Sequence, residues 1–262
     1  MNAGDKDVIA VVGAGRMGRG IAHVFAYAGR PITVLDVKPR SAEEFTKLAQ
    51  QARAEIGADM RFLASLGVMN DHQVAAALKL IDIRPAADAE AVLGPATVIM
   101  EGVPETREAK QSAFALISRL AKPDAIVTST TSSMLVTELQ GYISHPERYL
   151  NTHFLNPAFL IPLVEVSPGP ATMEAAVEKI MKLFEAVGKM PVRCAASPGY
   201  IVPRLQALLM SEAARMVADG VATAEAIDKA IMCGFGPRYA TMGVLEFTDW
   251  GGVDILYYGG NN

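Results

Sequence analysis

The pattern that most constrains the fold of this chain lies near its start. A short apolar run at 8–12, rich in β-branched residues, ends at a glycine cluster, and a helical pattern follows at 20–28. Gly13, Gly15 and Gly18 fall in the spacing G-x-G-x-x-G. Between a strand and a helix, this spacing permits a tight turn, close approach of a pyrophosphate and close packing of the helix on the strand. The pattern predicts a dinucleotide-binding βαβ unit.

A second apolar run, at 31–35, ends at Asp36. An acidic residue at this place can accept hydrogen bonds from the hydroxyls of an adenosine ribose, and it repels a 2′-phosphate. The sequence therefore favours NAD, although Lys38 and Arg40 leave NADP open. FAD is a further alternative, but flavoproteins with this fingerprint are usually much longer chains. The remaining alternative is a structural βαβ unit that binds no ligand.

Composition excludes several classes of protein. The 262 residues are 51% hydrophobic and 20% charged, which is typical of one large or two modest globular domains. A net charge of −4 without a Lys/Arg-dense run argues against a nucleic-acid binder. Cys194 and Cys233 fit no metal-ligand spacing and indicate reduced thiols. The polar N-terminus is unlike a signal peptide, and no apolar run approaches the roughly 18 residues of a membrane span. We expect a soluble cytoplasmic protein without a metal site.

Strand and helix patterns alternate along most of the chain. Further strands are predicted near 80–83, 96–100, 125–128, 148–155, 161–167 and 190–193, and helices at 41–66, 71–78, 105–120 and 172–187. From Ser197 onward the patterns are helical. The predicted fold class is α/β, with a Rossmann-type dinucleotide-binding domain at 1–194 and a smaller all-α C-terminal domain at 195–262.

The predicted helix at 41–66 belongs to an excursion longer than a minimal crossover between strands needs. It carries Arg53 and Arg61, which either meet an anionic substrate or are solvated charges on a helix face. The second interpretation is favoured, because most charges on a helix surface are solvated.

Two groups of polar residues indicate chemistry. Five consecutive hydroxyl residues, 129–133, follow a predicted strand at the edge where ligands of open α/β sheets bind, although such residues also make helix caps. His153 and Glu165 lie on two successive predicted strands, and Glu165 interrupts an apolar run. A buried carboxylate needs a partner, and a carboxylate that orients a histidine is the usual arrangement of a general base. The alternative for His153 is an ordinary core or surface histidine.

In these motifs the chain resembles the 3-hydroxyacyl-CoA dehydrogenase family over nearly its whole length. The matching segments are Gly13-Ala14-Gly15-Arg16-Met17-Gly18, Glu101-Gly102-Val103-Pro104-Glu105 with Lys110, Thr130-Thr131-Ser132-Ser133, His153-Phe154-Leu155-Asn156-Pro157, Leu163-Val164-Glu165-Val166 and Ser197-Pro198-Gly199-Tyr200-Ile201-Val202. The resemblance implies an N-terminal Rossmann-type domain and a helical C-terminal domain that forms a homodimer. It also implies a role in fatty acid metabolism.

The resemblance implies a role for each matching residue. His153 would take the proton of the substrate 3-hydroxyl as hydride leaves for NAD⁺, Glu165 would orient His153, and Ser132 would hydrogen-bond the substrate oxygen. The implied contacts to NAD are Gly13, Gly15, Arg16, Met17, Gly18, Asp36, Glu105, Lys110 and Asn156. The implied substrate is a 3-hydroxyacyl-CoA, which becomes the 3-keto thioester.

The sequence departs from the family pattern at three places. Pro203 and Thr130 stand where members of the family usually have asparagine, so two amide groups near the substrate are absent. The chain also stops at 259–262, somewhat earlier than family members usually do, so we expect the last helices, and part of the dimer interface with them, to be missing or trimmed. The first two departures keep open a related dehydrogenase of a free hydroxy acid, of the gulonate or carnitine type. An inactive NAD-binding relative is the third alternative.

Overall fold

The computed structural model describes residues 7–253 and residue 257, so the closing stretch 259–262 considered above lies outside the described residues. The chain divides into two compact units, Met1–Ile201 and Val202–Asn262. The sequence placed this division earlier, after residue 194. Residues 195–201 belong to the first unit, where Tyr200 is buried and hydrogen-bonds to Asn151.

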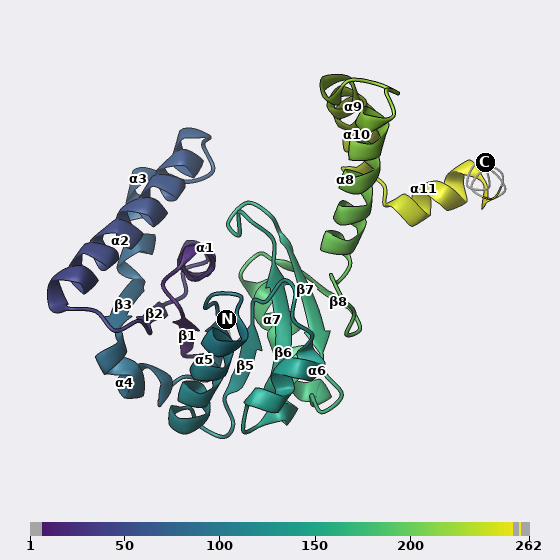
Figure 1. Cartoon of the computed structure of the whole chain (residues 1–262). Helices are drawn as coiled ribbons and strands as arrows, with labels where there is room; N and C mark the ends of the chain where they lie inside the picture. The colour runs from purple at the N-terminus through teal and green to yellow at the C-terminus, as the bar shows by residue number, and fades with distance from the viewer. Residues whose placement is uncertain (1–6, 254–256, 258–262) are drawn as a thin grey trace. The chain divides into compact units, whose positions relative to one another are not determined.

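The first unit is built on one sheet of eight strands in the order β3-β2-β1-β4-β5-β6-β7-β8 (Figure 1). The strands are β1 Ile9–Val12, β2 Ile32–Asp36, β3 Ile81–Pro85, β4 Val98–Glu101, β5 Ile126–Ser129, β6 Tyr149–Phe154, β7 Leu163–Pro168 and β8 Met190–Arg193. Neighbouring strands from β3 to β6 are parallel, β7 is antiparallel to β6, and β8 is parallel to β7. The order from β3 to β6 is that of a doubly wound dinucleotide-binding fold.

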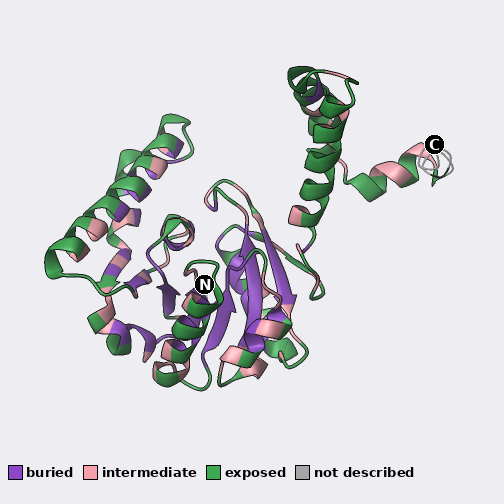
Figure 2. Cartoon of the chain, in the orientation of Figure 1, coloured by how far each residue is buried: buried purple, intermediate pink, exposed green. Residues whose placement is uncertain are grey.

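Helices cover both faces of the sheet, because its strands are apolar on both sides. In β1, Ile9 and Val11 pack into one core cluster, and Ala10 and Val12 pack into a second. The first cluster includes residues of α1 Arg16–Tyr27, α2 Ala42–Ser65, α3 Asp71–Lys79 and α7 Glu174–Ala186. The second includes residues of α4 Ala89–Leu93, α5 Arg107–Leu120 and α6 Val136–Leu139. The strands inside the sheet are correspondingly buried along nearly their whole length (Figure 2), whereas the edge strand β8 is largely exposed. The α/β fold class is confirmed.

Helix α2 begins with a capping box, in which the Ser41 hydroxyl accepts from the Glu44 N–H and the Glu44 carboxylate accepts from the Ser41 N–H. Farther along α2, the Arg53 guanidinium donates to the carbonyl oxygens of Leu78 and Ile81, at 3.3 and 2.7 Å. These bonds join α2 to the end of α3 and the start of β3. They give Arg53 a structural role within the fold.

The second unit is helical, as predicted. Its helices are α8 Val202–Ala218, α9 Ala224–Ala230, α10 Gly236–Tyr239 and α11 Val244–Gly251, with a π-helical turn at Ile231–Phe235 between α9 and α10. Helix α8 has no buried residue, and Figure 2 shows it exposed along most of its length. Its apolar side chains therefore lie largely in solvent within this single chain.

Candidate active site

The glycine-rich turn joins β1 to α1 at the carboxyl edge of the sheet. Gly13 has φ +115°, which L-residues rarely adopt, and a Cβ there would lie 2.7 Å from the Gly102 carbonyl oxygen. A Cβ on Gly18 would collide with the Gly13 carbonyl oxygen. A Cβ on Gly15 would meet nothing within 4 Å, because this residue faces open space. Gly13 and Gly18 thus serve the turn and the helix packing that the spacing predicts, and the open space beside Gly15 leaves room for a ligand.

A cavity of about 790 Å³ opens over this turn. Its lining includes Gly13 to Met17, Asp36 to Lys38, Arg40, Gly102 to Pro104 and one face of α5. Gly15 is the N-cap of α1 and has no side chain to occupy the first-turn N–H groups, so these remain available to an anion. Asp36 ends β2 on the same cavity wall. Free N–H groups and an acid fit the pyrophosphate and ribose of NAD.

The Asp36 carboxylate is already engaged in the structure. The Arg40 side chain donates from Nε to Asp36 Oδ2 at 2.5 Å, and both residues line the cavity. The pair holds the carboxylate at the end of β2, where its other oxygen faces the Lys38 N–H at 3.5 Å.

His153, Glu165 and Ser132 come together at the same edge of the sheet, beyond the lining of the cavity. His153 on β6 lies directly opposite Glu165 on the antiparallel β7, and its Nδ1 is 2.7 Å from Glu165 Oε2. Its Nε2 is 3.1 Å from the hydroxyl of Ser132, which follows the end of β5. Glu165 is fully buried, His153 is nearly so and Ser132 is exposed. One ring nitrogen therefore faces a buried carboxylate, and the other faces an accessible hydroxyl.

The segment that follows β8 completes the surroundings of His153. The Tyr200 ring stacks on the imidazole with centroids 4.8 Å apart and planes 4° from parallel. The next backbone N–H, of Ile201, donates to the second oxygen of Glu165 at 2.8 Å. Both oxygens of the Glu165 carboxylate are thus engaged.

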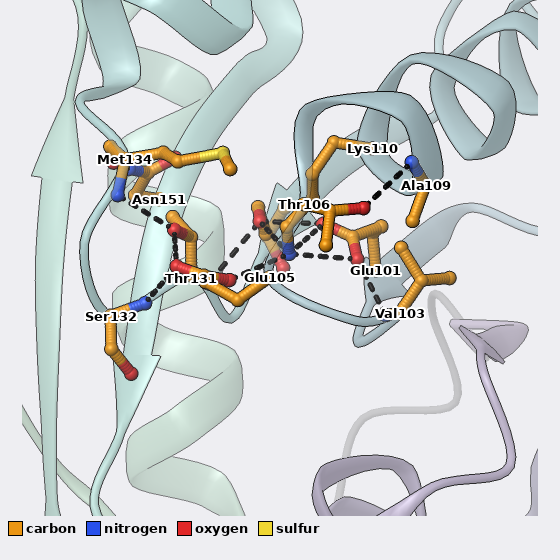
Figure 3. Close-up of polar contacts among 12 residues, drawn as sticks. Glu101, Val103, Glu105, Thr106, Ala109, Lys110, Thr131, Ser132, Met134 and Asn151 are labelled. Atoms are coloured by element: carbon orange, nitrogen blue, oxygen red, sulfur yellow. Dashed lines mark hydrogen bonds and ion pairs between the residues drawn. The ribbon is translucent and has the colours of Figure 1, made fainter.

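Glu105 anchors the hydroxyl segment that carries Ser132 (Figure 3). Its Oε1 accepts from the Thr131 hydroxyl, from the Ser132 N–H at 2.9 Å, and from the Ser133 N–H and hydroxyl at 3.0 and 2.9 Å. Partial burial alone raises the pKa of Glu105. The Thr131 hydrogen bond, the charge of Lys110 and the Ser133 donors outweigh burial and lower the pKa to about 2. Glu105 is therefore ionised at neutral pH.

Lys110 is fully buried behind Glu105. Its Nζ lies 3.0 and 2.9 Å from the two oxygens of Glu101, 3.4 Å from the Ser129 hydroxyl and 3.3 Å from Glu105 Oε2. Glu101 is fully buried as well, and it also accepts from the Ser129 hydroxyl at 2.6 Å. The ammonium group of Lys110 is thus enclosed by protein oxygens.

The other residues singled out in the sequence have simpler settings. Asn156 follows β6, is exposed and precedes a cis peptide bond to Pro157. Pro203 lies in the first turn of α8, where a missing N–H costs no intrahelical hydrogen bond. Thr130 is buried, and its backbone N–H donates to the Glu101 carbonyl oxygen at 2.9 Å.

Sequence reasoning missed the residues that surround His153. Tyr200 belongs to a recognised motif, but its contact with His153 depends on a turn that no local pattern reveals. Asn151 is buried in β6, where its amide donates to the Tyr200 hydroxyl at 2.9 Å and to the Met134 carbonyl oxygen at 3.0 Å. A polar amide inside a predicted strand, directly after Leu150, was the available signal, because buried amides need partners.

Within 7–253 and residue 257, no three His, Cys, Asp or Glu side chains are grouped so that they could hold a metal ion. Within the same residues, the helices are too short or too polar to span a bilayer.

Two family models together match almost the whole chain. They are the 3-hydroxyacyl-CoA dehydrogenase NAD binding domain, at residues 8–197, and the 3-hydroxyacyl-CoA dehydrogenase C-terminal domain, at residues 199–261. The chain is 36% identical over 249 residues to the 3-hydroxyadipyl-CoA dehydrogenase of Escherichia coli. This match covers 95% of the chain but 50% of that relative, so the chain spans half of the relative's length.

The names of two further relatives do not mention coenzyme A. The L-carnitine dehydrogenase of Pseudomonas aeruginosa is 35% identical over 92% of this chain and 70% of its own length. The crystal structure of 5-formyl-3-hydroxy-2-methylpyridine 4-carboxylic acid 5-dehydrogenase, described as an NAD⁺-dependent dismutase, superposes with a TM-score of 0.82. It shares 30% identity and covers 97% of this chain and 78% of its own. The family expected from the motifs is thus confirmed: the chain belongs to the 3-hydroxyacyl-CoA dehydrogenase family, and its first unit is the NAD-binding domain.

Proposed function

We propose that this chain is an NAD-dependent dehydrogenase that oxidises the 3-hydroxyl group of a 3-hydroxyacyl-CoA to the 3-keto thioester. The observation that carries the proposal is the line of contacts Glu165–His153–Ser132, at 2.7 and 3.1 Å. A buried carboxylate, an imidazole and an accessible hydroxyl in this order form a general base with a hydrogen-bonding group for the substrate oxygen.

The Glu165 carboxylate determines which nitrogen of His153 acts. An ionised carboxylate only accepts hydrogen bonds, so it holds a proton on Nδ1 and leaves the lone pair on Nε2. A substrate hydroxyl within reach of both Nε2 and Ser132 Oγ gives its proton to Nε2 and accepts a hydrogen bond from Ser132. The O–H and C–H bonds of the alcohol break and a carbonyl forms. Glu165 then stabilises the imidazolium.

When bound, NAD⁺ supplies the acceptor for the hydride that leaves the substrate carbon. The first-turn N–H groups of α1 would hold the pyrophosphate, and Asp36 would hold the adenosine ribose. The residues proposed to hold the cofactor are Gly13, Gly15, Arg16, Met17, Gly18, Asp36, Glu105 and Asn156. Lys110 is proposed to act on the cofactor site indirectly. Its ammonium group is enclosed by the carboxylates of Glu105 and Glu101, so it holds these two side chains in place.

Two classes of substrate are candidates for this site, a CoA thioester and a free hydroxy acid. A CoA thioester is supported by the family and by the 3-hydroxyadipyl-CoA dehydrogenase among the relatives. A free hydroxy acid is favoured by the carnitine dehydrogenase, and by Thr130 and Pro203, which lack the amides expected in the family. Both candidates use the same base and the same hydride transfer.

Substrate oxidation decides between these candidates. NADH formation is followed at 340 nm with (S)-3-hydroxybutyryl-CoA, free 3-hydroxybutyrate, L-gulonate and L-carnitine. We expect turnover of the CoA ester and weaker or no turnover of the free acids. Turnover of a free acid alone would assign the second candidate. NAD binding without oxidation of any hydroxy substrate would contradict both and indicate an inactive NAD-binding relative.

The role of His153 has its own test. His153→Ala removes the proton acceptor, and general-base catalysis commonly contributes about 10²–10⁴-fold to the rate. We expect a fall in kcat of this size with unchanged affinity for NAD. His72→Ala is the matched control, because His72 is exposed on α3. A fall of less than about threefold for His153→Ala would remove His153 from the mechanism.

We also propose that the chain forms a homodimer through its helical unit. Helix α8 exposes Leu205, Leu208, Leu209 and Met210, and it has no buried residue. Exposed apolar side chains grouped on one helix are typical of a protein interface.

A further inference from the structure

Tyr200 has a backbone conformation that bulky residues avoid. Its φ is +48°, in the left-handed region, and it directly follows Gly199 with φ +74°. The conformation is disfavoured for a residue with a large side chain, and such outliers persist where the surroundings hold them in place. Tyr200 is buried and aromatic, so its ring and hydroxyl are the groups to consider.

The ring of Tyr200 covers one face of His153. The two rings are parallel within 4°, with centroids 4.8 Å apart, and His153 is only 4% exposed. A flat side chain against the imidazole limits rotation about the His153 side-chain bonds and keeps water from that face. The ring thus favours one orientation, in which Nδ1 faces Glu165 and Nε2 faces Ser132.

The hydroxyl of Tyr200 is fixed from two sides. It donates to the Thr131 carbonyl oxygen at 2.9 Å and accepts from Asn151 Nδ2 at 2.9 Å. The Asn151 side chain lies beside Thr131 and Met134 in Figure 3, and its Oδ1 accepts from the Tyr149 hydroxyl at 2.7 Å. Because Thr131 directly precedes Ser132, the hydroxyl of Tyr200 also constrains the segment that carries Ser132.

The unusual backbone adds a third contact. The left-handed turn at Gly199 and Tyr200 directs the next N–H, of Ile201, to Glu165 Oε1 at 2.8 Å. One turn therefore contacts the carboxylate, the imidazole and the segment that bears the serine.

We propose that Tyr200 is a positioning residue that holds His153, Ser132 and Glu165 in register for proton transfer. The proposal rests on the proposed general-base role of His153. Tyr200 acts through these residues and need not touch the substrate. A change at Tyr200 is therefore expected to lower kcat without weakening NAD binding, because the cavity over the glycine turn does not include Tyr200.

Two substitutions separate the ring from the hydroxyl. Tyr200→Phe keeps the stacking and removes the hydrogen bonds to Thr131 and Asn151, so we expect kcat to fall about threefold to tenfold. Tyr200→Leu removes the stacking as well, and we expect a fall of about 10- to 100-fold, since small misplacements of catalytic groups have large effects. The Kd for NAD, measured by calorimetry, should stay within twofold in both.

A spectroscopic measurement tests the positioning without turnover. Proton NMR detects the His153 Nδ1 proton in its hydrogen bond to Glu165, and loss of the signal in His153→Gln assigns it. We expect a slowly exchanging signal in the unaltered chain and in Tyr200→Phe, and rapid exchange with water in Tyr200→Leu. If Tyr200→Leu does not fold, Tyr200→Phe provides the test. Its kcat should fall while its Kd for NAD stays unchanged.

Three results would overturn the proposal. They are a Tyr200→Leu kcat within twofold of the unaltered chain, an NAD affinity that falls in parallel with kcat, and an Nδ1 signal unchanged in Tyr200→Leu. Absence of turnover in the unaltered chain would instead contradict the proposed function, and the NMR signal would still decide whether Tyr200 positions His153.

Discussion

Asp36 and Arg40 form the charged pair on the cavity wall over the glycine turn. The carboxylate is almost buried at the end of β2, and Arg40 fixes one of its oxygens. A carboxylate in this place attracts ribose hydroxyls and repels a 2′-phosphate, while Arg40 moderates the repulsion. We therefore propose that the pair sets the preference between NAD and NADP.

Asp36→Ala should weaken NAD binding and reduce the factor by which the protein binds NAD more tightly than NADP. Hydrogen bonds to a charged group are worth about 1.5–3 kcal/mol, so we expect the Kd for NAD to rise roughly 10- to 150-fold. Calorimetric titrations with both cofactors measure the two constants. Asp82→Ala is the control, because Asp82 lies on the neighbouring β3, pairs with Arg84 and is not part of the cavity lining. An unchanged preference would show that Asp36 has no ribose contact.

His23 is a buried histidine in α1 with neither ring nitrogen hydrogen-bonded among the described residues. It stacks on Phe159 with centroids 4.7 Å apart and planes 3° from parallel. Burial, with a smaller contribution from the charge of Lys189, lowers the pKa of His23 from 6.5 to about 4. The residue therefore stays neutral in the folded state at pH values where it is protonated in the unfolded chain.

The lowered pKa of His23 predicts a loss of stability in mild acid. Between about pH 6.5 and pH 4 the unfolded chain binds the extra proton, so the free energy of unfolding falls as the pH falls. From pH 7 to pH 5 the expected loss is about 2 kcal/mol. Urea unfolding at both pH values should show this loss in the unaltered chain and in His72→Leu, but not in His23→Leu. Equal losses in all three would contradict the assignment.

Among the elements, β4, β5 and α5 are joined by the buried ion pair of Glu101 with Lys110. Glu101 ends β4, Lys110 projects from α5, and the Ser129 hydroxyl at the end of β5 bonds to Glu101. Two charges without solvent contact depend on each other, because each alone would carry the full cost of burial.

Lys110→Met should destabilise the first unit strongly. Removing one partner of a buried ion pair typically costs about 3–5 kcal/mol, because the other charge is left uncompensated. In urea unfolding, we expect this loss for Lys110→Met and partial recovery for the double variant Glu101→Leu/Lys110→Met. Lys122→Met, at an exposed position after α5, is the control. A loss below about 1 kcal/mol for Lys110→Met would show that the pair is dispensable.

Elements differ in how well local sequence predicted them. The long amphipathic helices α2, α5 and α7 were expected within two residues or so of their ends, since caps and apolar spacing mark helix ends. The short helices α4 and α6 were not expected. A helix of one turn has no periodicity to detect, and packing against the second core cluster stabilises it instead.

The oligomeric state of the whole molecule is expected to depend on the exposed apolar side chains of α8. Leu208 is 70% exposed and Leu205 is 53% exposed in the single chain. We expect the protein to behave as a dimer in light scattering coupled to size exclusion. Leu208→Glu should shift it to monomer, because a charge within an apolar interface is costly. Ala75→Glu, at an exposed position of α3 in the first unit, should remain a dimer. A monomeric unaltered chain would contradict the proposal.

Sequence alone determined the dinucleotide turn, the alternation of strands and helices, and the family. These features are local: glycine spacing, apolar periodicity and short motifs are each read within some ten to thirty residues. The same reasoning brought His153 and Glu165 together as a pair, because a carboxylate within an apolar strand requires a partner.

Only the tertiary structure decided the geometry around that pair. The antiparallel register of β6 and β7 sets His153 opposite Glu165, and the turn at Tyr200 reaches both from a distant part of the chain. It also decided that Lys110 is enclosed by Glu101 and Glu105. Such contacts join segments far apart in sequence, and they form because buried polar groups must find partners once the core has packed. No local pattern contains that information.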